Sequence, residues 1–132
     1  MEQKNEKLTI HLDIEENISI MADEFHFTNI IYNILDNSIK YCETKPTISI
    51  ASNKDSKGLY LTFKDNGIGI PAKNIPYVFD KFYRVNTKKN NEINGFGLGL
   101  FYVKKIVQQH HWKISVENNQ DCGIITTLFL PK

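Results

Sequence analysis

Several features that mark specialised classes of protein are scarce or missing in this sequence. Its 132 residues include two cysteines, Cys42 and Cys122, which form neither a CxxC pair nor a disulfide framework, so we expect two buried thiols in a reducing compartment. Seven glycines and four prolines exclude collagen-like and low-complexity chains. No run approaches the roughly 18 apolar residues of a membrane-spanning helix, and the N-terminus has no apolar signal-peptide core. We therefore expect a soluble, cytoplasmic domain without direct membrane contact, and leave open a membrane anchor in a longer native protein.

An excess of charge of one sign is also missing. Sixteen Lys and Arg residues balance 15 Asp and Glu residues, for a formal charge of +1. A protein that follows the phosphates of a nucleic acid carries a basic excess, so we expect no nucleic-acid partner. The length suits one domain, which should bury roughly two-thirds of its unfolded surface and fold without a disulfide or a metal.

Hydrophobic periodicity predicts the secondary structure. After a polar tail at 1–7, alternating residues at 8–14 and again at 18–22 predict a hairpin, and Asp23 is a candidate N-cap for a helix from about Glu24 to Cys42. The remaining predicted elements are strands at 47–52, 58–65, 112–118 and 123–131, a short helix at 71–82 and a helix at 98–111. Strand pairs separated by helices favour one two-layer α/β sandwich over residues 8–132.

The long helix carries an unusual polar stripe. At about 100° per residue, one arc of the helix gathers these side chains: Asn29, Asn33, Asp36, Asn37 and Lys40. The opposite side is apolar and should pack on the sheet: Phe27, Ile30, Ile31, Ile34 and Leu35. Asparagine is a poor helix former, so three of them one turn apart favour a function over a merely solvated face. Amide oxygens suit a hard cation such as Mg²⁺, and Lys40 offers a point charge to a phosphate.

Two glycine-bearing segments follow the helix, DNGIGIP at 65–71 and GFGLGL at 95–100. The second leads into a helix, where free backbone N–H groups and the helix dipole favour an anion. It is not a dinucleotide fingerprint, because position 100 is leucine and no strand precedes it. Asp65 ends a predicted strand, where its carboxylate is able to accept a hydrogen bond from an exocyclic amine such as that of adenine. Each segment alone is also compatible with a simple glycine turn.

Together these segments resemble the ATP-binding catalytic domain (HATPase_c, Bergerat fold) of sensor histidine kinases, in the wider family of DNA gyrase and heat-shock chaperone ATPases. The motifs that carry the resemblance are NIIYNILDNSIKY at 29–41, DNGIGI at 65–70, VFDKFYR at 78–84 and GFGLGL at 95–100. The resemblance implies a mixed, mostly antiparallel sheet with about three helices on one face. It also implies signal transduction by phosphorelay.

The family implies a role for each matching position. Asn37 would bind Mg²⁺, Asn33 would lie beside the phosphates of ATP and Lys40 would contact them. Tyr41 would stack on adenine and Asp65 would bind its amino group. The backbone contacts would come from Gly67 and Gly69 at the base, and from Gly95, Gly97, Leu98 and Gly99 in a lid at about 85–99. The terminal phosphate would be reached by Arg84, with Lys88 and Lys89 left open between a phosphate contact and a solvated loop.

The chain departs from the family pattern at several positions. His111-Trp112 stands where the family commonly has glycines after its last helix, and Phe96 is bulkier than the small residue usual inside the second glycine motif. The third glycine segment retains Gly123, but Asp121 replaces its first glycine, and Ile124 replaces the small hydroxyl residue that usually follows.

The chain contains no histidine in the sequence context of the family's phosphoacceptor. None of its four histidines, His11, His26, His110 and His111, is followed by an acidic residue, so we expect the acceptor in a separate helical dimerisation domain. A response regulator receiver domain is the further partner that the resemblance implies. The alternatives are a gyrase- or chaperone-type ATPase, which would use a glutamate base where this chain has Asn33, and an anti-sigma-factor-like serine kinase or nucleotide-dependent interaction module.

Overall fold

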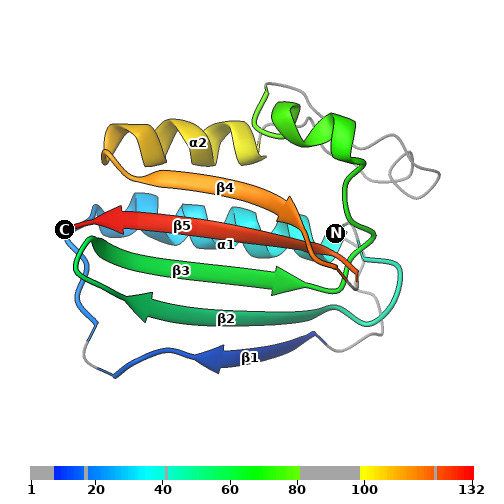
Figure 1. The fold of residues 1–132 in the computed structure, drawn as a ribbon, viewed down its shortest axis with the longest axis horizontal. Helices are drawn as coiled ribbons and strands as arrows, with labels where there is room; N and C mark the ends of the chain where they lie inside the picture. The colour runs from blue at the N-terminus through cyan, green and yellow to red at the C-terminus, as the bar shows by residue number, and fades with distance from the viewer. Residues whose placement is uncertain (1–7, 17, 41, 81–98, 121) are drawn as a thin grey trace.

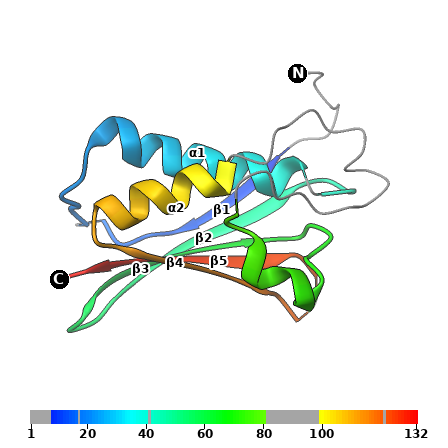
Figure 2. The same cartoon turned by 90° about the horizontal axis from the view of Figure 1, so that it is seen from above.

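The computed structural model describes residues 8–132 apart from 17, 41, 81–98 and 121. Its elements are β1 (Thr9–Asp13), α1 (Glu24–Lys40), β2 (Thr47–Lys54), β3 (Gly58–Asp65), the 3-10 helix η1 (Ala72–Tyr77), α2 (Gly99–Gln109), β4 (Lys113–Asn118) and β5 (Ile124–Pro131). The strands form one sheet in the order β1-β2-β3-β5-β4 (Figure 1). Figure 2 shows α1 and α2 side by side on one face of that sheet. The predicted two-layer α/β sandwich is confirmed.

Helix α1 begins and packs as its sequence predicts. The Asp23 carboxylate accepts the His26 backbone N–H at 3.0 Å, which is the N-cap bond, and the helix ends at the basic residue Lys40. Ile30 and Ile34, one turn apart, are 0% and 2% exposed and belong to the main core. The predicted apolar side of the helix therefore does face the sheet.

The main core lies between the sheet and the two helices. Its buried residues are Ile30, Ile34, Ile48, Ile50, Leu59, Leu61, Phe63, Val103, Ile106, Val107, Ile114, Leu128 and Leu130. A smaller cluster joins η1 to the ends of β4 and β5, and its buried residues are Ile70, Val78, Val116 and Ile124. Each buried aliphatic side chain stabilises the fold by about 1.5–3 kcal/mol relative to exposure, before the opposing conformational entropy is counted.

The first predicted hairpin is wrong. Residues 18–22 form no strand, and β1 pairs with β2 in parallel, with Ile10 opposite Ile48 and Leu12 opposite Ile50. Parallel neighbours need a crossover connection, and α1 supplies it. Ile18 and Ile20 pack partly buried against the main core instead of pairing with a strand. The other strand pairs, β2 with β3, β3 with β5 and β4 with β5, are antiparallel.

Two further predictions are only partly confirmed. Within the segment expected to be a helix at 71–82, the 3-10 helix η1 covers Ala72–Tyr77 and contains Pro76, which has no backbone N–H to donate. Residues 81 and 82 lie outside the described residues. Cys42 is buried as expected, whereas Cys122 is exposed in the turn before β5, so only one of the two thiols is buried.

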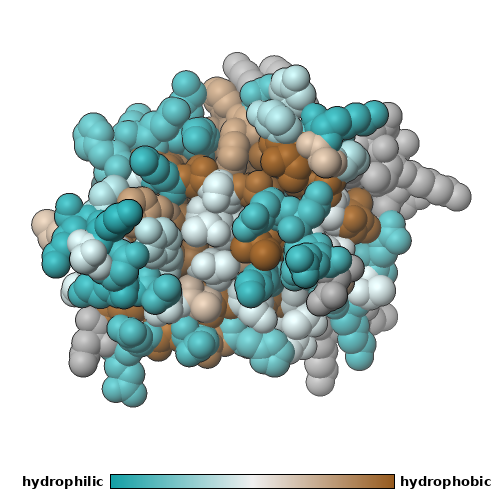
Figure 3. Space-filling model, viewed as in Figure 1, coloured by the Kyte–Doolittle hydropathy of each residue, from teal (hydrophilic) through white to brown (hydrophobic). Residues whose placement is uncertain are grey.

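No helix formed by the described residues covers the other face of the sheet (Figure 2). The residues of β2, β3 and β5 that alternate with the core positions are partly or fully exposed. Figure 3 shows this face as mostly hydrophilic and neutral, with scattered apolar patches. Tyr60 and Phe129 pair across it with ring centroids 4.6 Å apart. Among the described residues, no helix combines the length and the apolar character needed to cross a membrane.

Candidate functional site

The carboxylate of Asp65 is the best-anchored polar group in the candidate site. Asp65 is the last residue of β3 and is 8% exposed. Its Oδ1 accepts the backbone N–H groups of Gly67 and Ile124, both at 3.0 Å, and its Oδ2 accepts the hydroxyl of Ser38 at 2.8 Å. Three hydrogen bonds from three different segments satisfy most of a buried carboxylate, which would otherwise be costly to bury.

Gly123 is required beside this carboxylate. A Cβ at position 123 would lie 2.0 Å from the Asp65 carbonyl oxygen and 2.4 Å from Oδ1, and the residue has a positive φ of 79°. Only glycine allows the turn before β5 to approach β3 so closely. The third glycine segment departs from the family pattern at two positions, but it retains the glycine that the packing requires.

Asn66 links the first glycine segment to the connection between α1 and β2. Its Oδ1 accepts the Thr47 N–H at 2.9 Å and its Nδ2 donates to the Lys45 carbonyl at 2.8 Å. The buried thiol of Cys42 lies 3.3 Å from the same Oδ1. These contacts fix the end of β3 relative to the end of α1, the two elements that carry Asp65 and the asparagine stripe.

Asn118, the last residue of β4, holds the far end of the first glycine segment. Its Oδ1 accepts the Ile70 N–H at 2.9 Å and its Nδ2 donates to the Ile70 carbonyl at 2.6 Å. Gly69 has a positive φ of 77°, and a Cβ there would lie 3.1 Å from Asn118 Oδ1. The predicted need for glycine at 69 thus has a local conformational cause.

One asparagine of the stripe, Asn33, faces the start of α2. The Asn33 amide donates from Nδ2 to the Asn29 carbonyl at 2.8 Å, which fixes the orientation of the amide. Its Oδ1 lies 3.4 Å from the position of a Cβ on Gly99, the first residue of α2. Asn33 and Asn37 are both half-buried. An amide oxygen therefore faces the N-terminus of α2, where backbone N–H groups and the helix dipole favour an anion.

Lys40 forms an ion pair within its own helix. Its Nζ lies 3.0 Å from Asp36 Oδ2, with both side chains partly exposed. An i,i+4 pair of this kind contributes about 0.3–0.5 kcal/mol, so a phosphate would displace or share it at little cost. Lys40 is therefore available to a phosphate at this end of the molecule.

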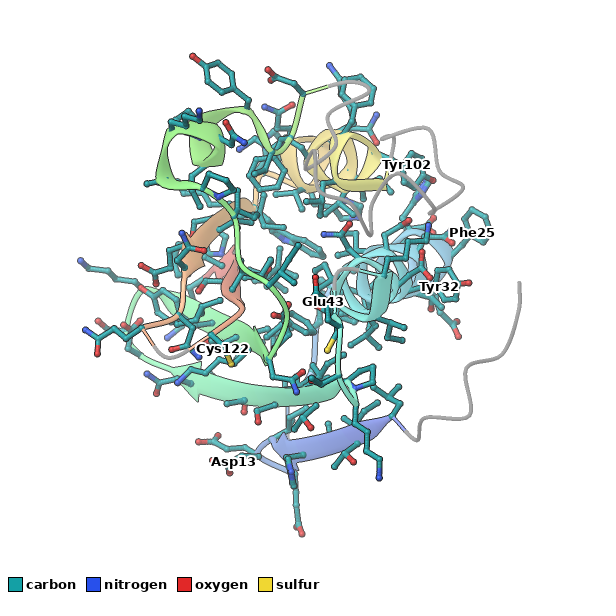
Figure 4. All side chains as sticks on the ribbon, turned by 90° about the vertical axis from the view of Figure 1, so that its right-hand side faces the viewer. Asp13, Phe25, Tyr32, Glu43, Tyr102 and Cys122 are labelled. Atoms are coloured by element: carbon teal, nitrogen blue, oxygen red, sulfur yellow. The ribbon has the colours of Figure 1, made fainter. Side chains whose placement is uncertain are left out.

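The elements that carry these groups end or begin toward one end of the sandwich (Figure 1). The last turn of α1, the end of β3, the end of β4 and the start of α2 all lie there, and Figure 4 views the molecule from this end. Glu43 and Cys122, labelled in that view, mark the segments after α1 and before β5. Five predicted site residues, Tyr41, Arg84, Gly95, Gly97 and Leu98, lie outside the described residues, as do Lys88 and Lys89.

Sequence reasoning missed three residues of this site. Ser38 continues the buried spacing of Ile30 and Ile34, and a hydroxyl at that position was a detectable signal. Asn66 follows Asp65 in a turn-forming DNG sequence, but its partners are about 20 residues away. Asn118 lies 48 residues from Ile70, and nothing in its local sequence indicates that contact.

The sequence of this chain matches a known protein family over most of its length. The family described as histidine kinase-, DNA gyrase B-, and HSP90-like ATPase matches residues 22–132. The chain belongs to this family. The match includes α1 with the asparagine stripe, both glycine segments and the two C-terminal strands.

Named relatives narrow the resemblance to sensor kinases. The chain is 40% identical over 133 residues to the sensor protein RprX of Bacteroides fragilis, an alignment that covers 99% of this chain and 25% of RprX. The mycobacterial sensor histidine kinase MprB superposes with a TM-score of 0.80 at 23% identity, over 94% of this chain and 83% of that one. The histidine kinase ThkA, solved in complex with the response regulator TrrA, gives 0.75 at 21% identity, over 95% of this chain and 34% of that one. The two structures establish the shared fold.

Proposed function

We propose that this chain is the ATP-binding catalytic domain of a sensor histidine kinase, which binds Mg-ATP and presents the γ-phosphate to a histidine on a separate dimerisation domain. The chain spans only a quarter of RprX, so the activity of the whole protein is part of the proposal. The observation that carries it is the location of two groups at one end of the fold. The buried Asp65 carboxylate and the Asn33 amide oxygen, facing the start of α2, both lie there.

The two groups lie at different heights along α1. Ser38, which touches Asp65, is five residues after Asn33, or about 7.5 Å along the helix axis. A base bound at Asp65 would thus place its phosphates toward Asn33 and the N-terminus of α2. The carboxylate would accept the exocyclic amine of adenine, and Gly67 and Gly69 would let the backbone approach the ring.

The asparagine pair fits a magnesium ion by its chemistry. The Nδ2 of Asn33 donates a hydrogen bond to the helix backbone, and its oxygen faces Gly99. Asn37 is half-buried one turn later. Oxygen ligands shared with phosphates are what Mg²⁺ prefers. Asn37 would hold the ion, with Asn33 beside the phosphates, and the ion would neutralise charge on the triphosphate. Lys40 and Arg84 would add positive charge at the phosphates, since phosphoryl transfer depends on positioning and charge neutralisation.

Two of the four histidines, His26 and His110, lie away from the residue that the phosphates would approach. His26 lies in the first turn of α1, seven residues before Asn33, which is about 10 Å along the axis from the residue that the phosphates would approach. His110 packs beside His26 at that same end, with ring centroids 6.5 Å apart. We therefore propose that the acceptor histidine lies in another domain, in the cytoplasm. The phosphate would pass next to a response regulator, the class of protein with which ThkA was solved. Isolated chain incubated with γ-labelled ATP should show little self-labelling, and strong labelling would contradict this assignment.

Hydrolysis is the weaker alternative because Asn33 cannot act as a general base. An amide has no titratable group that takes a proton from water near neutral pH. Measured release of free phosphate distinguishes the two functions. Rapid turnover by the isolated chain would favour an ATPase of the gyrase or chaperone type.

The central experiment is calorimetric titration of Mg-ATP into wild type, Asn37→Ala and Asp65→Asn. The asparagine at 65 can still accept at Oδ1, but it replaces the acceptor at Oδ2 with a donor that opposes the adenine amine. We expect both variants to bind at least about tenfold more weakly, the equivalent of 1.4 kcal/mol or more. Asp55→Asn is the matched control, because Asp55 also accepts backbone N–H groups but lies in the β2–β3 turn. Unchanged affinity in Asp65→Asn would overturn the proposed site.

A further inference from the structure

Ser38 occupies a position that core packing alone would give to an aliphatic residue. It follows Ile30 and Ile34 at four-residue spacing on the buried face of α1, and it is 6% exposed. A buried hydroxyl requires a partner, and serine within a helix commonly bonds to the carbonyl four residues earlier. Here the hydroxyl donates across to β3, to Asp65 Oδ2 at 2.8 Å.

This bond determines what the carboxylate can still accept. A carboxylate has about four acceptor positions, two on each oxygen. Oδ1 already accepts from Gly67 and Ile124, and the close approach of Gly123 covers it. Oδ2 accepts from Ser38 and therefore has one position left.

The Ser38 hydroxyl is limited in the same way. Its single hydrogen is used on Asp65, so its oxygen can only accept further hydrogen bonds. The pair thus presents acceptors alone toward a ligand. A purine with an amino group at the position that meets Oδ2 is attracted, and a purine with a carbonyl oxygen there is repelled.

We propose that Ser38 is a positioning residue that sets the base specificity of the site, by orienting Asp65 so that Oδ2 offers one acceptor to the 6-amino group of adenine. This inference rests on the proposed nucleotide-binding function. It assigns the choice between 6-amino and 6-oxo purines to the pair formed by Ser38 and Asp65, rather than to Asp65 alone. Without the hydroxyl, Oδ1 would still be held by Gly67 and Ile124, but Oδ2 would lose the Ser38 donor and take up water in its place.

The test compares Mg-ATP with Mg-ITP, which differ at the 6-position of the purine. Titrations use wild type, Ser38→Ala and Ser38→Thr, with folding followed by thermal unfolding. Wild type should prefer ATP strongly. Ser38→Ala should bring the ATP-to-ITP affinity ratio down by about tenfold, the equivalent of losing one charge-assisted hydrogen bond. Ser38→Thr, which retains the hydroxyl, should retain the ratio.

The control is Val107→Ala, a fully buried position on α2 in the same core. It should lower the unfolding temperature and leave the affinity ratio unchanged, so general destabilisation is separated from base selection. If Ser38→Ala does not fold, Ser38→Cys, a near-isosteric and weaker donor, should reduce the ratio in the same direction. A ratio that stays constant across folded Ser38 variants would overturn the inference while the proposed function stands. Wild type that binds neither nucleotide would overturn both.

Discussion

Asn118 binds both polar groups of one backbone residue: its Oδ1 accepts the Ile70 N–H at 2.9 Å, and its Nδ2 donates to the Ile70 carbonyl at 2.6 Å. The pair joins the end of β4 to the segment that leaves Asp65. Ile70 itself is buried in the smaller hydrophobic cluster. The amide therefore orients the glycine segment and seats its last residue in the core.

Replacing Asn118 by alanine should weaken both the fold and nucleotide binding. Two backbone groups lose their partner, which should lower the free energy of unfolding by about 2 kcal/mol. Because the glycine segment loses its anchor, the affinity for Mg-ATP should fall several-fold. Urea unfolding and calorimetric titration measure the two effects.

Asn53→Ala provides the comparison, since Asn53 is an exposed asparagine near the end of β2. It should unfold at nearly the wild-type urea concentration. Asn118→Asp should be at least as damaging as Asn118→Ala, because a carboxylate would face the Ile70 carbonyl oxygen. Equal unfolding midpoints for Asn118→Ala and Asn53→Ala would show that the two bonds to Ile70 contribute nothing.

Local features of the structure were predictable from the sequence, and contacts between distant segments were not. The N-cap at Asp23 and the buried spacing of Ile30 and Ile34 follow from a few neighbouring residues. The parallel pairing of β1 with β2 does not, because it depends on a crossover through α1, and alternation in a strand carries no information about its partner. The contact of Asn118 with Ile70 is hidden for the same reason. Asp65 was predicted from its motif, yet its partner Ser38 was not.

Gly99→Ala should change stability and nucleotide binding in opposite directions. Gly99 begins α2, where alanine favours the helix by up to about 1 kcal/mol. The new methyl group would lie 3.4 Å from Asn33 Oδ1, in the space that the ion and phosphates would occupy. We expect a slightly higher unfolding midpoint in urea and a several-fold lower affinity for Mg-ATP.

The exposed α2 residue Gln108 supplies the control. Gln108→Ala should raise the helix propensity of α2 slightly without altering nucleotide affinity, because it lies in the last turn. If Gly99→Ala bound Mg-ATP as tightly as Gln108→Ala does, the assignment of ligand to the space between Asn33 and α2 would be untenable.

His111→Gly should stabilise the protein. His111 follows α2 and has a positive φ of 61°, a conformation that glycine adopts freely and a residue with a Cβ adopts at a cost of about 1–2 kcal/mol. Glycine also has more conformational entropy in the unfolded chain, which opposes folding. The free energy of unfolding should therefore rise by only about 0.5–1 kcal/mol. His111→Val should be destabilised by about 1 kcal/mol or more, because a β-branched residue is least tolerated there. A higher urea midpoint for His111→Val than for His111→Gly would show that the backbone at position 111 is not strained.

Asp23 should contribute an acid-sensitive part of the stability. Its bond from the His26 backbone N–H lowers the pKa of the carboxyl group below the ordinary value of 3.8, desolvation opposes this, and the charges of His26 and His110 lower it further. Since the pKa is lower in the folded state, the stabilisation is present above pH 3.8 and is lost as the pH falls through the lowered value. Asp23→Asn retains a capping side chain without the titration, so it should match wild type near neutral pH and lose less stability on acidification. Asp23→Ala should be less stable at every pH. Parallel acid-unfolding curves for wild type and Asp23→Asn would mean that this cap does not titrate with folding.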